Sequence, residues 1–139
     1  MSTSIEKARD QIINEIAKHE TFCIVGHIRP DGDCIGSQIG LALALKAQGK
    51  KVVCWTQDEV PSKLEFMVPS GMMQKPEPGR SFDCVIATDC AAFDRLGETG
   101  SCVNDRKVFI NIDHHTLRLA ECPDHVFPHR VIHRGLAAD

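Results

Sequence analysis

The segment GHIRPDGDCIGS, residues 26–37, places three metal-binding side chains within seven positions: His27, Asp31 and Asp33. Imidazole and carboxylate groups are ligands that Mn²⁺, Mg²⁺, Fe²⁺ and Zn²⁺ accept from proteins. The segment follows a short apolar run, TFCIVG, and precedes a stretch with helical spacing. We therefore expect these side chains on a turn between a buried strand and a helix.

Further groups of the same kind follow two later apolar runs. Asp89 ends FDCVIATD, residues 82–89, and KVFINID, residues 107–113, runs into a histidine pair. Ligands of open α/β sheets bind outside the carboxyl ends of the strands, where residues distant in sequence converge. We expect seven side chains to line one crevice there: His27, Asp31, Asp33, Asp89, Asp113, His114 and His115.

This donor set predicts a particular chemistry. Four ionised carboxylates in one crevice repel, and bound cations are the simplest way to stabilise them. The oxygen-rich balance favours a harder ion such as Mn²⁺. Two ions about 3.5 to 4 Å apart can orient a water, lower its pKa and stabilise the charge of an in-line displacement at phosphorus. The pattern therefore predicts hydrolysis of a phosphate ester.

Each residue taken singly has a plainer interpretation. His27 alone would more often be a packed or solvated loop histidine, and PDGD is a common turn composition. Asp89 could cap a short helical turn expected at 91–97, and adjacent His114 and His115 point to opposite faces if they lie in a strand. Their joint occurrence at three strand ends favours the functional interpretation. The other histidines have no carboxylate at ligand spacing and are expected at the surface: His19, His125, His129 and His133.

The first loop is expected to bend sharply. Pro30 fixes its own φ and favours an extended Arg29 before it. Gly32 permits a tight or left-handed turn. Gly36 and Ser37 would let the start of the helix approach a bound phosphate or metal ion.

Hydrophobic periodicity predicts the elements that position these groups. Helices are expected from Ile5 to about residue 18 and from Cys34 to Gln48, where Gly49 ends the second one. Strands are expected at 21–26, 51–56, 82–89 and 107–113. Residues 57–81 contain six Pro and Gly residues, so we expect an excursion with one or two helical turns at 62–67. The alternation predicts an α/β fold, a mostly parallel sheet with flanking helices.

The end of the chain lacks this periodicity. Its 139 residues suggest one domain, which we place at 1–116, with an atypical, irregular tail at 117–139. Four strands alone would leave an edge strand and an apolar face uncovered, and homodimerisation through that edge or that face is one expectation.

Composition excludes some partners. The net charge of −3 gives no bulk basic field for nucleic acid or anionic membrane, and no stretch approaches the about 18 apolar residues of a membrane span. The odd cysteine count, without a secretory signal, predicts a cytoplasmic protein with reduced thiols. The seven cysteines form no C-x-x-C pair: Cys23, Cys34, Cys54, Cys84, Cys90, Cys102 and Cys122.

The motifs together resemble the DHH phosphoesterase family. GHIRPDGDCIGS is similar to its first motif, ATDCAAFDRLG to its second, and NIDHHT to the Asp-His-His signature. The order and separations agree over about residues 10–116. DEVPSKLEFMVPSG resembles a segment of the RecJ-like subgroup that degrades short oligoribonucleotides and dephosphorylates 3′-phosphoadenosine 5′-phosphate.

The resemblance implies a Rossmann-like DHH catalytic domain that uses two metal ions, usually Mn²⁺, with Mg²⁺ or another divalent ion as the alternative. By motif, His27 and Asp31 would hold one ion, Asp33 and Asp113 would serve the second, and Asp89 would bridge both. His114 and His115 would face the scissile phosphate, so these two and Asp89 are the expected catalytic residues. The implied substrate is a short oligonucleotide or a phosphorylated nucleotide.

The sequence departs from the family after Thr116. The family continues with a fourth motif that carries another metal-binding Asp and with a C-terminal substrate-binding domain, so we expect a truncated, incomplete catalytic domain. Two classes of function stay open: a metal-dependent phosphoesterase, and a catalytically weak or inactive fragment that binds metal or nucleotide. A pyrophosphatase of the same superfamily is a third, narrower alternative.

Overall fold

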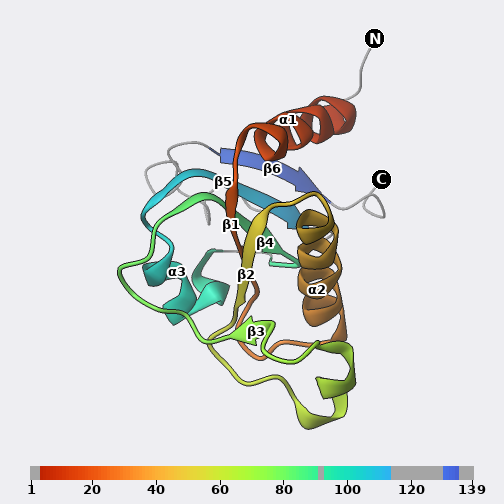
Figure 1. The fold of residues 1–139 in the computed structure, drawn as a ribbon, viewed down its shortest axis with the longest axis vertical. Coiled ribbons are helices and arrows are strands. Elements are labelled where there is room, and N and C mark those ends of the chain that lie inside the picture. Colours follow the sequence, from red (N-terminus) through yellow and green to blue (C-terminus); the bar gives the residue numbers. More distant parts are fainter. Residues whose placement is uncertain (1–3, 91–92, 114–129, 135–139) are drawn as a thin grey trace.

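A computed structural model describes residues 4–90, 93–113 and 130–134 of the chain. Helices and strands alternate along most of it (Figure 1). In chain order the elements are α1 (Ser4–Lys18), β1 (Thr21–Val25), α2 (Gly32–Ala47), β2 (Lys51–Trp55), the 3₁₀ helix η1 (Ser62–Met67), β3 (Met73–Gln74), β4 (Phe82–Thr88), the 3₁₀ helix η2 (Phe93–Leu96), α3 (Glu98–Cys102), β5 (Arg106–Asp113) and β6 (Arg130–Arg134).

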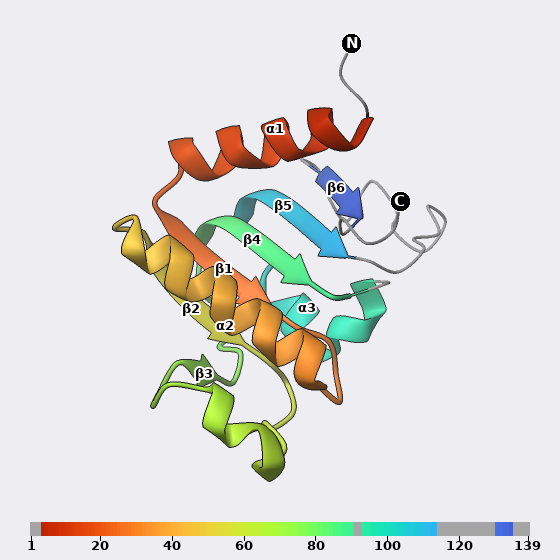
Figure 2. The same cartoon turned by 90° about the vertical axis from the view of Figure 1, so that its right-hand side faces the viewer.

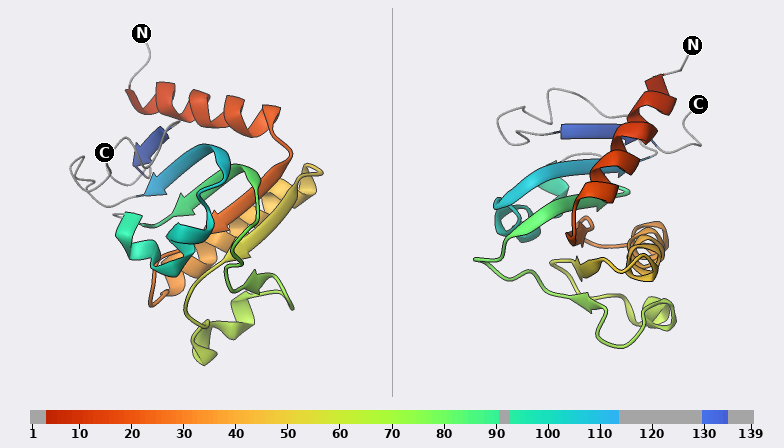
Figure 3. Two further views of the ribbon diagram at one scale, coloured as in Figure 1. Left: turned by 90° about the vertical axis from the view of Figure 1, so that its left-hand side faces the viewer. Right: turned by 45° about the horizontal axis from the view of Figure 1, so that its top comes forward.

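The strands form one six-stranded sheet in the order β3-β2-β1-β4-β5-β6. Every neighbouring pair is parallel, and β1, β4 and β5 therefore end at the same edge (Figure 3). The predicted α/β fold with a parallel sheet and flanking helices is confirmed. Sequence reasoning missed the two-residue β3 and the short α3, because neither segment has a usable period.

Both faces of the sheet are buried, as expected of a parallel sheet. Helices α1 and α2 cover one face, while η2 and α3 lie on the other (Figure 2). Alternate residues of one strand enter different cores: Phe22 and Ile24 pack with α2, and Cys23 and Val25 pack with Leu96 of η2. This arrangement leaves the carboxyl edge of the strands to the loops that carry the predicted ligands.

Strand β6 corrects the prediction of an irregular segment at 117–139. Residues 130–134, RVIHR, pair in parallel with β5, from Phe109 opposite Arg130 to Asp113 opposite Arg134. Two β-branched residues in five suit a strand, and the pairing satisfies backbone groups that β5 would otherwise expose at an edge. Strand β6 therefore covers β5, and the other residues of this segment lie outside the described ones.

Gln38 fixes α2 against the sheet. Its side chain is fully buried and its Nε2 donates to Ile24 O and Trp55 O, both at 3.1 Å, at the ends of β1 and β2. A Cβ on Gly26 would collide with Gln38 Oε1 and lie 2.6 Å from Cys34 Sγ. The absence of a side chain at Gly26 lets the start of α2 approach the strand end.

Gln38→Leu should destabilise the protein by about 2 to 3 kcal/mol, because two hydrogen bonds are lost and strand carbonyls stay buried. Denaturant unfolding followed by circular dichroism measures this free energy. Gln48→Leu, at the exposed C-cap of the same helix, is the matched control and should change it little. Equal effects of the two substitutions would contradict the role given to Gln38.

Candidate metal site

Three of the predicted ligands meet where β1 and β4 end. His27 Nε2 lies 3.7 Å from Asp89 Oδ2 and 3.9 Å from Asp31 Oδ1, and one potential ligand atom from each residue lies within 4.8 Å of the others. The side chains of His27 and Asp89 are 9% and 4% exposed, whereas that of Asp31 is 64% exposed. Two of the three side chains are therefore buried, and that of Asp31 is open to solvent.

These separations fit a divalent cation. Metal–ligand bonds of about 2.1 Å place adjacent donors about 3 Å apart and opposite donors about 4.2 Å apart. The distances from His27 Nε2 fall inside that interval and are too long for hydrogen bonds. One imidazole and two carboxylates are also a donor set that Mn²⁺, Zn²⁺ or Fe²⁺ accepts.

The orientation of His27 is set by its other ring nitrogen. Nδ1 lies 2.7 Å from the carbonyl oxygen of Ile28. A carbonyl can only accept a hydrogen bond, so Nδ1 carries a proton, and in the neutral form of the ring Nε2 would present its lone pair to the two carboxylates. A histidine that ligates a metal through one nitrogen almost always donates from the other in this way.

Asp31 is placed by the start of α2. It is the N-cap residue, with extended backbone, and its Oδ1 accepts a hydrogen bond of 2.9 Å from Cys34 N. The helix consequently begins at Gly32, two residues before the predicted start.

Asp89 sits in a left-handed turn just beyond β4. Its φ is +54°, a value rare for residues other than glycine and costing on the order of 1 kcal/mol. The turn is held because Asp89 N donates to Ile112 O at 3.0 Å, and Asn111 Nδ2 donates to Cys90 O at 3.2 Å. Strand β5 therefore fixes the backbone from which the Asp89 carboxylate reaches His27.

The backbone of the first loop differs from the expectation. Arg29 is not extended before Pro30 but has a φ of +51°, and Gly32 does not have a positive φ. The left-handed position thus falls on Arg29, where the N–H donates to Asp58 Oδ2 at 2.7 Å. This charge-assisted bond stabilises a conformation that the following proline disfavours.

The other predicted site residues do not belong to the three-residue group or lie outside the described residues. Asp33 lies in the first turn of α2, is exposed and is not part of the three-residue group. The backbone of Asp113 ends β5 next to Asp89, since Ile112 O accepts from Asp89 N. His114 and His115 lie outside the described residues, so their predicted position facing the phosphate stays a prediction.

Sequence reasoning missed the residues that support this group. Asn111 is a polar residue inside the apolar run KVFINID, and Gln38 lies between apolar positions on one face of a helix. A buried polar residue in such a pattern is a usable signal, because it must find a hydrogen-bond partner. Gln57 and Asp58 gave no signal, since they lie in an ordinary polar turn.

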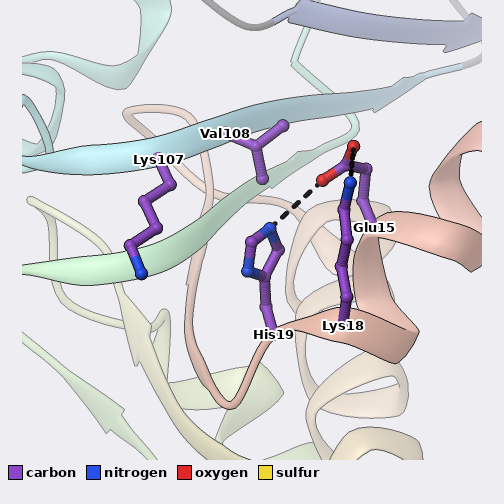
Figure 4. Close-up of a pocket in the computed structure, with 5 residues that line it drawn as sticks. All are labelled: Glu15, Lys18, His19, Lys107 and Val108. Carbon is purple, nitrogen blue, oxygen red and sulfur yellow. Dashed lines mark hydrogen bonds and ion pairs between the residues drawn. The ribbon is translucent and has the colours of Figure 1, made fainter.

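A polar pocket at the opposite edge of the sheet corrects the expectation for His19. It has a volume of about 210 Å³ and is lined by Glu15, Lys18, His19, Lys107 and Val108 (Figure 4). His19 is mostly buried, and its Nε2 lies 3.1 Å from Glu15 Oε2. The prediction of a surface histidine without a carboxylate partner is wrong, because Glu15 lies one helical turn earlier on α1.

The thiols near the site are poor metal ligands. Burial raises the pKa of the Cys34 thiol to about 12. It also raises the pKa of the Cys54 thiol and that of the Cys84 thiol to about 12. A metal needs the thiolate, so the buried cysteines act as small core residues, as predicted.

Comparisons with known proteins identify the family of the chain. A family model described as "DHH family, N-terminal domain" matches residues 21–134 and thus extends past Thr116, where the sequence resemblance ended. The chain is 38% identical over 98 residues to a bifunctional oligoribonuclease and PAP phosphatase NrnA of Thermus thermophilus, covering 66% of this chain and 27% of that protein. It is 44% identical over 46 residues to the NrnA of Mycoplasma genitalium, covering 32% and 14%.

Among solved structures, the chain resembles an exopolyphosphatase-related protein from Bacteroides fragilis. The TM-score is 0.72 at 23% identity, over 96% of this chain and 41% of that one. This likeness supports the fold. The chain spans about a quarter of the length of the Thermus relative and less of the Mycoplasma one. The model of the DHH N-terminal domain matches most residues of the chain, including the segments that carry His27, Asp31 and Asp89. The chain therefore belongs to the DHH family.

Proposed function

We propose that the chain acts as a divalent-metal-dependent phosphoesterase on short oligonucleotides or on phosphorylated nucleotides such as 3′-phosphoadenosine 5′-phosphate. The observation that carries the proposal is the meeting of His27, Asp31 and Asp89 within 4.8 Å at the strand ends. The Thermus relative, named for both activities, shares 38% identity across 98 residues.

Each residue of the group has a defined part in this proposal. His27 supplies the lone pair of Nε2, and Asp31 and Asp89 supply the negative charge that a cation requires. A bound divalent ion supplies an activated water and stabilises charge that develops on the phosphoryl oxygens. Mn²⁺ is the proposed ion, because two of the three donors are carboxylates.

The residues after β5 complete the proposal. Asp113 is the last residue of β5, and its backbone lies next to Asp89 because Ile112 O accepts from Asp89 N, which supports its predicted role as a further ligand. We keep His114 and His115 as the groups proposed to face the scissile phosphate. Asp33, exposed and outside the group, is proposed to act only if a second ion is bound.

The environment of the protein is also a proposal. Among the residues that the structure describes, five buried cysteines and one partly buried cysteine are free thiols, which supports a reducing compartment such as the cytoplasm. Within the helices that the structure describes, none combines the length and apolar character needed to cross a membrane. A homodimer stays a prediction.

Release of mononucleotides from a dinucleotide, and of phosphate from 3′-phosphoadenosine 5′-phosphate, tests the activity. We expect turnover with Mn²⁺ and none after chelation by EDTA, measured by chromatography. Inorganic pyrophosphate is assayed in parallel, and its preferential hydrolysis would favour the pyrophosphatase alternative. A chain that binds Mn²⁺ but hydrolyses none of these substrates would overturn the proposal.

That last outcome would support the second candidate, a metal-binding fragment without turnover. The specific observation in its favour is the group of His27, Asp31 and Asp89, because binding a metal ion requires only these ligands and no contact with a substrate. It predicts a rise in the midpoint of thermal unfolding with Mn²⁺, since a ligand that binds only the folded state stabilises it.

A further inference from the structure

We propose that Asp58 is a positioning residue that orients His27 through the peptide group between Ile28 and Arg29. The inference rests on the proposed metal-binding function and assigns a supporting role to a loop outside the three-residue group. Asp58 follows β2, 31 positions from His27 along the chain, and does not touch the histidine itself.

The two sides of a single peptide group connect the residues. Its carbonyl, Ile28 O, accepts from His27 Nδ1 at 2.7 Å, and its N–H, on Arg29, donates to Asp58 Oδ2 at 2.7 Å. A planar peptide directs its N–H and C=O in opposite directions, so the carboxylate, the peptide and the imidazole form one chain of hydrogen bonds. Bonds in such chains strengthen one another.

The carboxylate is matched to this task. The hydrogen bond from Arg29 N is the largest cause that lowers the pKa of Asp58, and a second bond, from Gln57, acts in the same direction. Ionised Asp58 therefore polarises the peptide so that Ile28 O is a better acceptor for Nδ1–H. This arrangement matches the carboxylate–histidine pairs that support metal ligands, with a peptide placed between the two groups.

Neighbouring loops hold Asp58 and the peptide in place. Gln57 Nε2 donates to Asp58 Oδ1 at 3.3 Å, and Gln57 Oε1 accepts from Glu98 N at 2.6 Å. Ile28 N donates to Arg95 O at 2.6 Å. The loops after β1 and β2 are thus bonded to the segment that follows β4, and the left-handed Arg29 is held between them.

The ring tautomer of His27 in the metal-free chain tests the inference without a metal. At about pH 8, above the usual titration range of histidine, ¹⁵N chemical shifts of the ring report which nitrogen carries the proton, with His27→Gln providing the assignment. We expect the Nδ1–H form in the wild type. In Asp58→Ala we expect a population of the Nε2–H form beside the Nδ1–H form. Asp58→Ser, which leaves a turn-forming side chain, should give the same result. Asp58→Asn keeps an acceptor oxygen and should retain the Nδ1–H form.

Mn²⁺ affinity, measured from the free-ion signal in electron paramagnetic resonance, is the second readout. Loss of an outer-shell partner of a metal-binding histidine typically costs 10- to 100-fold, and we expect about tenfold for Asp58→Ala because a peptide intervenes. Asp58→Asn should lose less. Glu59→Ala removes the same charge from the next, exposed residue and should leave both readouts unchanged.

The outcomes separate this inference from the proposed function. If the wild type binds no Mn²⁺, the proposed function fails, and the tautomer of His27 still decides the role of Asp58. If Asp58→Ala and Asp58→Ser fold but retain the wild-type ring shifts, the inference is overturned whatever the metal affinity. An equal loss of affinity in Glu59→Ala would also overturn it, because general electrostatics would then explain the effect.

Discussion

Asp89→Asn should abolish Mn²⁺-dependent hydrolysis and weaken Mn²⁺ binding by more than about 100-fold. The substitution removes a ligand that lies 3.7 Å from His27 Nε2, and even an outer-shell partner is typically worth 10- to 100-fold in affinity. Loss of about 4 kcal/mol of transition-state stabilisation corresponds to roughly a 10³-fold lower rate. Isothermal titration with Mn²⁺ and the dinucleotide assay measure the two effects.

Asparagine is the informative substitution at this position. It matches aspartate in size and tolerates the left-handed φ of +54° that the turn requires, so the metal-free protein should unfold at nearly the wild-type temperature. Asp10→Asn is the matched control: it removes the same charge from an exposed residue of α1 that is outside the group. If Asp10→Asn lost as much affinity as Asp89→Asn, the three-residue group would not be the principal metal site.

The sequence was sufficient for the sheet and for the convergence of ligands at its edge. Strands 21–26, 51–56, 82–89 and 107–113 agree with β1, β2, β4 and β5 to within one residue at each end, because parallel strands buried on both faces are continuous apolar runs. His27 and Asp89 could be paired from sequence since each directly follows such a run. Their 3.7 Å separation follows from the adjacency of β1 and β4, which no local pattern encodes.

What the sequence could not provide is the set of contacts between loops. Arg29 takes a left-handed φ because its N–H meets Asp58, a residue after a different strand. The chain before Pro30 would otherwise prefer extended backbone, so a tertiary contact overrides a local preference here. His19 illustrates the same limit, because its burial against Glu15 depends on how the end of α1 packs.

The largest loss of stability is expected from Gly97→Ala, in the segment that joins η2 to α3. Gly97 has φ +61° and ψ −136°, a backbone conformation that is essentially restricted to glycine. It costs other residues about 2 kcal/mol. A Cβ there would also collide with Gln57 Oε1 and lie 2.7 Å from Ile28 Cγ2. We expect a destabilisation of about 4 kcal/mol in total, and a fall of roughly 10 to 15 °C in the midpoint of thermal unfolding.

Two further glycines separate the causes of that loss. Gly79 also has a positive φ, +85°, but a Cβ there meets nothing within 4 Å, so Gly79→Ala measures backbone strain alone. Gly40, in α2, has open space and no positive φ, and Gly40→Ala should stabilise the helix by up to about 1 kcal/mol. If Gly97→Ala were no worse than Gly79→Ala, the contact with Gln57 and Ile28 would be unimportant. A larger loss that is accompanied by weaker Mn²⁺ binding would instead connect this remote glycine to His27, because Ile28 carries the carbonyl that orients the ring.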